Sequence, residues 1–416
     1  MRKTTTVKVM AILCFSLIGS LALFLSARSA SASPGYSDIY GIKLTLRYGD
    51  RKWEFRYPDI VYSDGFDEGI EGFEKDFRGR IMRERPFSCC YDLADAYGKL
   101  RQIAAQIECE PVNAKVKFFP DRKGKFAIKE DKKGRRVDIE KLYSQIKKSL
   151  SKGVSAEVEI VPKLIDPEIT AKKLKRATAV RSEFSTDFSS SPPERKHNIA
   201  LSLRQFNGLI VWPGEEVSFN AVVGPRTQER GYKVSKIIVG GEFVKGFGGG
   251  VCQSSTTLYN ALLLADIKIT EQHRHTLAIS YVPPSFDAMV NISTADLKFL
   301  NDSGNFIFIK AWTEGNRAYV RIYGEKLVYT IKRRSTVLKV YEKPREKVVV
   351  DFEGKYRDIY EGERRVIIPS KPKIESMGEL LYYKNGRIVK IKPIRRDVYM
   401  PLVGKEVVGT AKRPKR

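Results

Sequence analysis

The chain of 416 residues is too long for one ordinary hydrophobic core, so we expect several domains. Hydrophobic residues make up 42% of it, which is enough for packed cores and excludes a wholly disordered protein. Its 75 basic and 49 acidic residues leave a net charge of +26, which indicates a polyanionic partner such as nucleic acid, an anionic wall polymer or anionic lipid.

The N-terminal segment, residues 1–32, predicts export. Arg2, Lys3 and Lys8 precede an uncharged run over residues 9–27, which as a helix would extend about 28 Å, close to the hydrocarbon thickness of a bilayer. Ala30-Ser31-Ala32 then fits the small-residue pattern of a cleavage site. We predict a signal peptide or an N-terminal membrane anchor, with the rest of the chain in the cell envelope or secreted. Nucleic acid is therefore not expected as a partner, and no nucleic-acid-binding signature is present.

Residues 36–170 predict a small α+β domain. Residues 42–48 alternate as a strand and can pair with residues 52–57 across Gly49-Asp50. Asp138 has the position of an N-cap for an amphipathic helix. In an oxidising exterior, Cys109 and one of the pair Cys89-Cys90 can form a disulfide, and three reduced thiols are the alternative.

The remaining chain divides by composition into three parts. Residues 171–194, which include the run 189–193 of three serines and two prolines, predict a linker. Residues 195–325 predict a mixed α+β domain in which a helix over 251–264 carries Cys252 and packs on a mainly antiparallel sheet. Residues 326–416 are basic and β-rich. The fold class is therefore multidomain α+β.

Cys252 follows three glycines and begins the predicted helix. A helix N-terminus favours a thiolate and lowers the pKa of a thiol, and a thiolate is the reactive form in nucleophilic catalysis. His273 and His275 follow, and Asp287 and Asp296 are acids that can orient an imidazole. The order of helix cysteine, strand histidine and strand acid is that of papain-like and transglutaminase-like enzymes. A structural cysteine packed at the helix start is the alternative, and a zinc site at the two histidines is weaker still.

The central segment resembles the VanW family over about 130 residues. The resemblance is carried, in order, by 198–200 (NIA), 213–215 (PGE), 218–220 (SFN), 223–227 (VGPRT), 230–232 (RGY), 248–253 (GGGVCQ), 255–260 (STTLYN), 273–275 (HRH), 280–283 (SYVP) and 287–288 (DA). It implies an envelope protein related to vancomycin B-type resistance proteins, with a defined pocket and no settled reaction.

Two flanking regions resemble other wall-associated domains. Residues 111–116, 134–138 and 167–170 are similar to the peptidoglycan-binding domain that often precedes VanW domains. Residues 383–386 and 401–410 are similar to the end of G-five domains, which implies such a domain from about residue 340.

These features lead to a first functional hypothesis of an envelope protein that binds peptidoglycan, its stem peptides or anionic wall polymers. The alternative is a cysteine-dependent transpeptidase or amidase on peptidoglycan peptides, and a third reading is a scaffold with an inactive pocket. We expect no cofactor and no metal. The candidate catalytic residues are Cys252, His275, His273 and Asp287, and the candidate binding residues are Gly248, Gly249, Gly250, Gln253, Thr256, Arg226 and Asn220.

Overall fold

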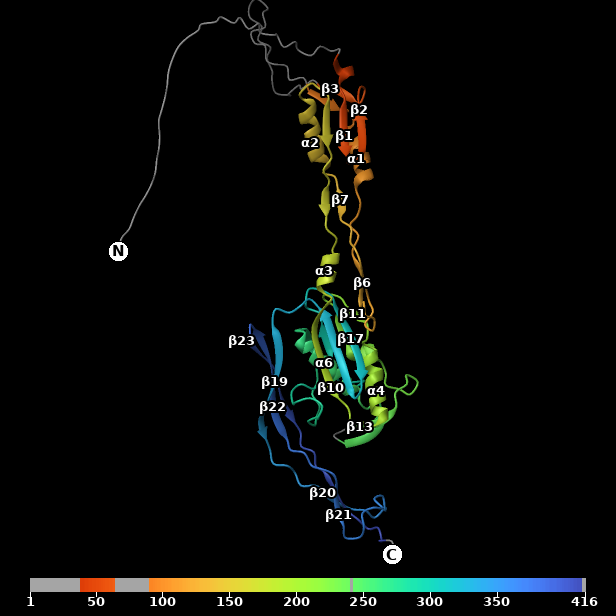
Figure 1. The fold of residues 1–416 in the computed structure, drawn as a ribbon, viewed down its shortest axis with the longest axis vertical. Helices are drawn as coiled ribbons and strands as arrows, with labels where there is room; N and C mark the ends of the chain where they lie inside the picture. The colour runs from red at the N-terminus through yellow and green to blue at the C-terminus, as the bar shows by residue number, and fades with distance from the viewer. Residues whose placement is uncertain (1–37, 64–89, 240–241, 414–416) are drawn as a thin grey trace, which may run out of the picture. The chain divides into compact units, whose positions relative to one another are not determined.

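The computed structural model describes residues 38–63, 90–239 and 242–413, and it divides the chain into two compact units (Figure 1). Unit 1 comprises Met1–Glu108 and Arg136–Lys163, and unit 2 comprises Cys109–Arg135 and Leu164–Arg416. The predicted export segment, residues 1–32, lies outside the described residues. Within the described ranges, no helix is long and apolar enough to cross a membrane. Helices and small, mainly antiparallel sheets alternate, so the prediction of a multidomain α+β protein is confirmed.

Unit 1 is built on a three-stranded sheet in the order β2-β1-β8. The central strand β1 (Leu44–Tyr48) is antiparallel to β2 (Arg51–Phe55) and parallel to β8 (Ala156–Glu159). The predicted hairpin across Gly49-Asp50 is therefore confirmed. Its core joins the sheet to two helices and a strand pair, namely α1 (Ala96–Ile107), α2 (Ile139–Leu150), β3 (Ile60–Ser63) and β4 (Cys90–Leu93).

Helix α2 begins where its sequence predicts. The carboxylate Oδ1 of Asp138 accepts a hydrogen bond from the backbone N–H of Lys141 at 3.0 Å, which satisfies one of the amides left without a partner at a helix start. The short elements η1 (Asp38–Gly41), β7 (Gly134–Arg136) and β9 (Lys163–Ile165) complete this part of the chain. Cys109 carries a free thiol, and Cys89 and the side chain of Cys90 lie outside the described residues.

The main sheet of unit 2 is antiparallel throughout, in the order β10-β18-β17-β11. Its strands are β10 (Ala179–Asp187), β18 (Arg317–Gly324), β17 (Ile307–Glu314) and β11 (Leu209–Val211). Helix α6 (Val251–Leu264) packs against β10 and β18, and α4 (Pro193–Arg204) packs against β17 and α6 (Figure 1). Residues 179–187, which the sequence places in a linker, thus form an edge strand of this sheet.

The rest of the central part of unit 2 consists of small sheets and short helices around this core. A sheet is formed by β12 (Glu216–Ser218), β16 (Lys298–Leu300) and β15 (Lys268–Glu271), and a hairpin by β13 (Val234–Val239) and β14 (Glu242–Phe247). A second hairpin, β5 (Lys115–Phe118) and β6 (Phe126–Lys129), packs Phe118 and Phe126 onto Phe308. The short helices are α3 (Ala171–Arg176) and α5 (Phe219–Val223).

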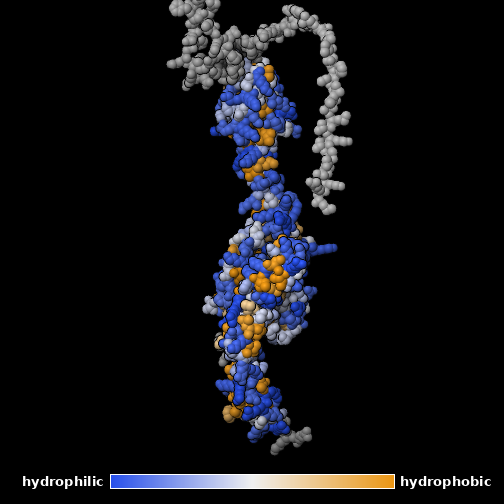
Figure 2. All heavy atoms as spheres, turned by 90° about the vertical axis from the view of Figure 1, so that its left-hand side faces the viewer, coloured by the Kyte–Doolittle hydropathy of each residue, from blue (hydrophilic) through white to orange (hydrophobic). Residues whose placement is uncertain are grey.

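The C-terminal part of unit 2 is β-rich, as predicted for residues 326–416. Long antiparallel strands β19 (Thr330–Val340), β22 (Ile374–Lys384) and β23 (Arg387–Tyr399) form one sheet. The strands β20 (Lys347–Val350), β24 (Lys405–Val408) and β21 (Arg364–Ile368) form another. Ile331, Leu380 and Tyr382 belong to the same hydrophobic core as α6, so the first of these sheets is packed onto the central fold. Figure 2 shows apolar patches on an otherwise mainly hydrophilic face.

Candidate active site

Cys252 is the second residue of α6, directly after a turn made of three glycines. Gly250, the N-cap, has φ 113°, and Gly248 has φ 82°, values that strongly favour glycine. A Cβ on Gly249 would lie 2.6 Å from the carbonyl oxygen of Lys236. The glycines therefore bring the backbone close to its neighbours and place the thiol at the helix N-terminus.

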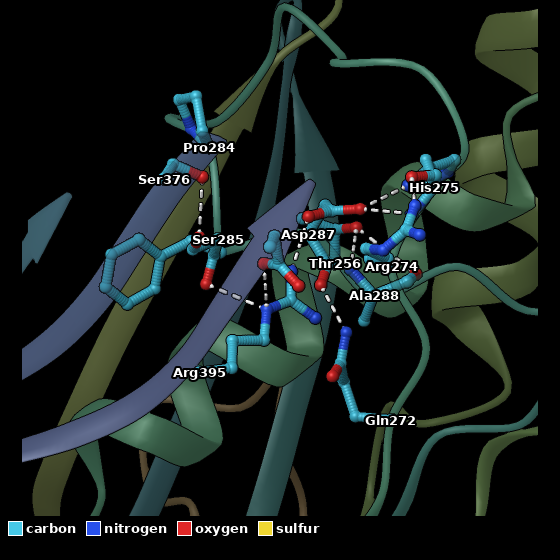
Figure 3. A network of polar contacts seen from close by, with 12 residues as sticks. Thr256, Gln272, Arg274, His275, Pro284, Ser285, Asp287, Ala288, Ser376 and Arg395 are labelled. Carbon is cyan, nitrogen blue, oxygen red and sulfur yellow. Dashed lines mark hydrogen bonds and ion pairs between the residues drawn. The ribbon is translucent and has the colours of Figure 1, made fainter. Parts of the chain in front are cut away.

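His275 is bound to Asp287 through two hydrogen bonds. Its ring Nδ1 lies 2.7 Å from Oδ2 of Asp287, and its backbone N–H donates to the same oxygen at 2.6 Å (Figure 3). Asp287 is fully buried and His275 is 8% exposed. Since Nδ1 faces the carboxylate, Nε2 is the ring nitrogen left for the thiol. The sequence analysis selected Asp287 as the candidate acid with Asp296 as the alternative, and the structure places Asp287 on the imidazole.

The other carboxylate oxygen of Asp287 is held by the C-terminal sheet. Oδ1 accepts hydrogen bonds from Nη2 of Arg395 at 2.5 Å and from the hydroxyl of Tyr399 at 2.6 Å, both on β23. Nε of Arg395 also donates to the carbonyl oxygen of Ser285 (Figure 3). Burial alone would raise the pKa of Asp287, but the hydrogen bond from His275 and the charge of Arg395 lower it to about 2. Asp287 is therefore a carboxylate at any physiological pH.

The thiol of Cys252 and the imidazole of His275 form a coupled pair. Burial alone would raise the pKa of Cys252, but a hydrogen bond and the charge of His275, with smaller effects of the Val290 carbonyl and Arg226, lower it below its usual value. Burial alone would lower the pKa of His275, but Asp287 and Cys252 raise it to about 9. Opposite shifts in two adjacent groups favour a thiolate beside an imidazolium. Sγ also lies 3.3 Å from the carbonyl oxygen of Val290.

Helix α6 fixes the segment that carries Asp287. Ser255 Oγ donates to the carbonyl oxygen of Ala288 at 2.6 Å, Thr256 Oγ1 accepts from the backbone N–H of Ala288 at 2.9 Å, and Asn260 Nδ2 donates to the carbonyl oxygen of Phe286 at 2.7 Å. Residues three and four positions apart on a helix share one face. The same face carries Cys252. The helix therefore positions both the thiol and the segment that carries Asp287. Thr256, predicted to bind ligand, instead holds this backbone.

His273 and Asp296 lie in a different network. His273 Nε2 is 2.9 Å from Oε1 of Glu271, while Asp296 accepts hydrogen bonds from the Ser218 hydroxyl and the backbone N–H of Asn220. Of the two predicted histidines, only His275 interacts with the thiol within the described residues. His275 and Asp287 also lie on irregular segments and not on the expected strands, in keeping with Pro283 and Pro284 between them, which lack the N–H that a strand ladder needs.

The other predicted binding residues divide into two groups. The side chain of Gln253 is 1% exposed and donates to the carbonyl oxygen of Asp187, so it ties α6 to the end of β10. Asn220 accepts a hydrogen bond from Nη2 of Arg226 at 2.5 Å, and the charge of Arg226 acts on Cys252. Arg226 therefore lies at the site, while Gln253 supports the fold.

Two backbone amides at the start of α6 remain for an oxyanion. The N–H of Val251 donates to the Gly248 carbonyl at 3.1 Å, and the N–H of Gln253 donates to the Gly250 carbonyl at 2.9 Å. The first N–H groups of a helix have no helical partner, and in the described part of the chain the N–H of Cys252 has none of these turn partners either. Among the described residues, the N–H groups of Gly250 and Cys252 form no backbone hydrogen bond, so these two amides are the ones left for an oxyanion.

Arg195 lies over the ring of Tyr281, and both are close enough to Cys252 to interact with it electrostatically. With Arg395 and Tyr399, they are four residues at the site that were not selected from the sequence. Tyr281 lies within the stretch 280–283 that carries the family resemblance, so the sequence offered a signal for it. Arg195 starts a helix after two prolines and had no distinguishing pattern. Arg395 and Tyr399 alternate on a basic strand 108 and 112 residues after Asp287, and such long-range pairing leaves no local signal.

Two family models match parts of the chain. Residues 194–323 match the family model described as "VanW like protein", and residues 71–159 match the one described as "Putative peptidoglycan binding domain". The chain is 34% identical over 246 residues to "Uncharacterized protein YoaR" of Bacillus subtilis (strain 168), covering 58% of this chain and 78% of that protein.

Two further similarities are more limited. The chain is 30% identical over 125 residues to "Vancomycin B-type resistance protein VanW" of Enterococcus faecalis (strain ATCC 700802 / V583), covering 29% of this chain and 46% of that protein. A solved structure titled "Crystal structure of HP0197-G5" aligns to 20% of this chain and 97% of its own length, with 14% identity and a TM-score of 0.11.

Proposed function

The chain belongs to the VanW family, and from that premise we propose that it is a cell-wall protein that performs cysteine-dependent acyl transfer on peptidoglycan peptides. The observation that carries the proposal is the linked order of Cys252, His275 and Asp287, in which a thiol, an imidazole and a buried carboxylate adopt the relation of a catalytic triad. The match to a peptidoglycan-binding domain supports the wall as the location of the substrate.

The first half of the proposed reaction forms a thioester. The thiolate of Cys252 attacks the carbonyl carbon of a substrate amide, and the negative oxygen of the tetrahedral intermediate accepts a hydrogen bond from the Cys252 N–H. His275, protonated at Nε2 and held by Asp287 at Nδ1, gives its proton to the leaving nitrogen. The C–N bond breaks, an amine leaves, and the acyl group stays on Sγ.

The second half releases the acyl group. Neutral His275 takes a proton from the attacking group, which bonds to the acyl carbon as the C–S bond breaks and the thiolate returns. An amine acceptor gives a new amide, as in a transpeptidase, and water gives a free acid, as in an amidase. Both outcomes use the same residues, so the site supports the pair of reactions as one class.

The flanking regions are proposed to deliver the site to the wall. Residues 36–170, which include the matched range 71–159, would bind peptidoglycan, and the β-rich segment from about residue 340 would act as a G-five-like wall-associated domain. Peptidoglycan binding without catalysis is the second candidate function, and the same match favours it. The export segment at residues 1–32 remains a prediction, since it lies outside the described residues.

The experiment is an assay of the full chain with peptidoglycan stem peptides, followed by mass spectrometry of the products and of the protein. We expect an acyl adduct on Cys252, together with new amide or hydrolysed products, and Cys252→Ala should remove both. Sacculus retention is measured on the same two proteins. Retention without adduct or products in the wild type would contradict the enzyme and favour the binding function.

A further inference from the structure

Two arginines flank Cys252 without an acidic partner. Arg195 on α4 donates from Nη1 to the Ser191 hydroxyl at 2.6 Å, and Arg226 donates from Nη2 to the amide oxygen of Asn220. Both lie close enough to Cys252 for their charges to act on the thiol. Among the side chains that the structure describes, no carboxylate forms an ion pair with either guanidinium.

The glycine turn before Cys252 packs directly on these two side chains. A Cβ on Gly248 would lie 2.9 Å from Cβ and Cγ of Arg226, and a Cβ on Gly250 would lie 3.1 Å from Cγ of Arg195. Any larger residue would push the arginine stems away. The turn that presents the thiol is thus also the surface on which both arginines are placed.

The two guanidinium groups keep donors that no acceptor among the described residues satisfies. Both side chains are half-buried, and burial lowers the pKa of each. Each arginine has one neutral oxygen as its hydrogen-bond acceptor, and Asp296 acts on Arg226 through its charge without forming an ion pair with it. Arg195 additionally lies over the ring of Tyr281, 6.0 Å from its centroid, which orients it without neutralising it.

A buried hydroxyl beside Arg226 also lacks a partner. Tyr232 is 3% exposed, and its hydroxyl has no hydrogen-bond partner among the described residues. The charge of Arg226 acts on this phenol. Unpaired donors on two arginines together with an unpaired hydroxyl are the groups that a bound anion with several acceptor oxygens would satisfy.

We propose that Arg195 and Arg226 form a carboxylate-binding subsite beside Cys252, so that the acyl donor is a peptide with a free carboxylate near the amide that is cleaved. The inference rests on the proposed function for the cleavage step, but carboxylate binding itself does not require turnover. A guanidinium pairs with a carboxylate through two parallel hydrogen bonds, which adds orientation to charge attraction. The carboxylate would therefore position the donor relative to Sγ.

The test measures binding in the full chain carrying Cys252→Ala, which has no thiol to be stabilised by the arginines. Three synthetic stem tetrapeptides are titrated by calorimetry: one with both carboxylates free, one with the terminal carboxylate amidated, and one with the internal glutamate carboxylate amidated. We expect one of the two amidations to weaken binding by about tenfold or more, the size of a lost charge-assisted hydrogen bond. Which one does so identifies the carboxylate that is bound.

The arginines are then replaced one at a time in the same background. Arg195→Gln and Arg226→Gln should each reduce the preference for the free carboxylate to within about threefold, while Arg204→Gln, an exposed arginine on the same helix α4, should keep it. Equal binding of all three peptides, no binding of any of them, or a preference that survives both substitutions would overturn the subsite.

Failure of the subsite and failure of the proposed function give different results. A wild-type protein that forms the acyl adduct equally well with free and amidated peptides keeps the enzymatic function and loses the subsite. A Cys252→Ala protein that shows the arginine-dependent preference, beside a wild type that forms no adduct, keeps the subsite and loses the enzyme.

Discussion

Asp287 is held by two regions of unit 2 that differ in what their sequences reveal. Helix α6, inside the family-matched range 194–323, binds the backbone on either side of Asp287 through Ser255, Thr256 and Asn260. Strand β23, outside that range, binds the carboxylate itself through Arg395 and Tyr399. The helix thus fixes where the acid lies, and the strand fixes how its carboxylate is oriented and charged.

The difference teaches that the candidate site is not confined to the family-matched segment. Nucleophile, imidazole and acid all come from residues 252–287, yet the acid is supported by a strand that starts more than 60 residues after the match ends. The contributions of the family-matched segment and of β23 can be separated by substituting residues of one and leaving the other intact.

The largest effect is expected from Asp287→Asn. The amide has nearly the same shape as the carboxylate that α6 and β23 hold in place, but it lacks the negative charge. An amide can present its N–H toward Nδ1 of His275 and favour the wrong tautomer, so acyl transfer should fall on the order of 10³-fold. Steady-state rates with the stem peptide measure this, and circular dichroism checks the fold. A loss below about tenfold would show that Asp287 has no part in orienting His275.

The pH dependence of alkylation and of acyl transfer tests the coupling between the Cys252 thiol and the His275 imidazole. Because the pKa of Cys252 is lowered, alkylation by iodoacetamide should stay fast at neutral pH and fall about a hundredfold over two pH units below that pKa. Acyl transfer should also fall as pH rises through about 9, where His275 loses the proton that the leaving amine needs.

The control for that profile is His275→Gln. Without the imidazolium, the pKa of the thiol should rise, so the alkylation curve should move to higher pH while the acyl-transfer limb near 9 disappears. A wild-type alkylation curve centred at the pKa of an ordinary cysteine would contradict the coupled pair.

A smaller effect is expected from Arg395→Gln, which changes only the C-terminal side. Asp287 would keep His275 and Tyr399 as partners but lose the guanidinium, so its pKa should rise and acyl transfer should fall about tenfold. Arg387→Gln, at an exposed residue at the start of the same strand, is the matched control. A merely structural role would lower the melting temperature without moving the alkylation profile, whereas a positioning role should move that profile.

The sequence predicted the local half of this arrangement better than the long-range half. The glycine turn, the helix from 251 to 264 and the proximity of His275 follow from short motifs. Asp287 was selected with Asp296 as the alternative, but the sequence offered no geometric reason for this order, because only tertiary packing brings one of the two acids to His275. Arg395 pairs with Asp287, a residue 108 positions away, and such a pairing leaves no local sequence pattern. Strand β10 is rich in serine and threonine, so its sequence resembles the linker that was predicted there.

The smallest effect is expected from His273→Gln, and it discriminates between two histidines that the sequence could not rank. His273 faces Glu271 and is part of the network of Lys298 and Asp296, away from the thiol. Its loss should therefore change acyl transfer by less than about twofold, against a loss on the order of 10³-fold for His275→Gln. Measured in parallel, equally small losses for the two variants would mean that either imidazole can serve Cys252, and equally large losses would mean that both are needed; in both cases the pairing of His275 with Asp287 would not determine the base.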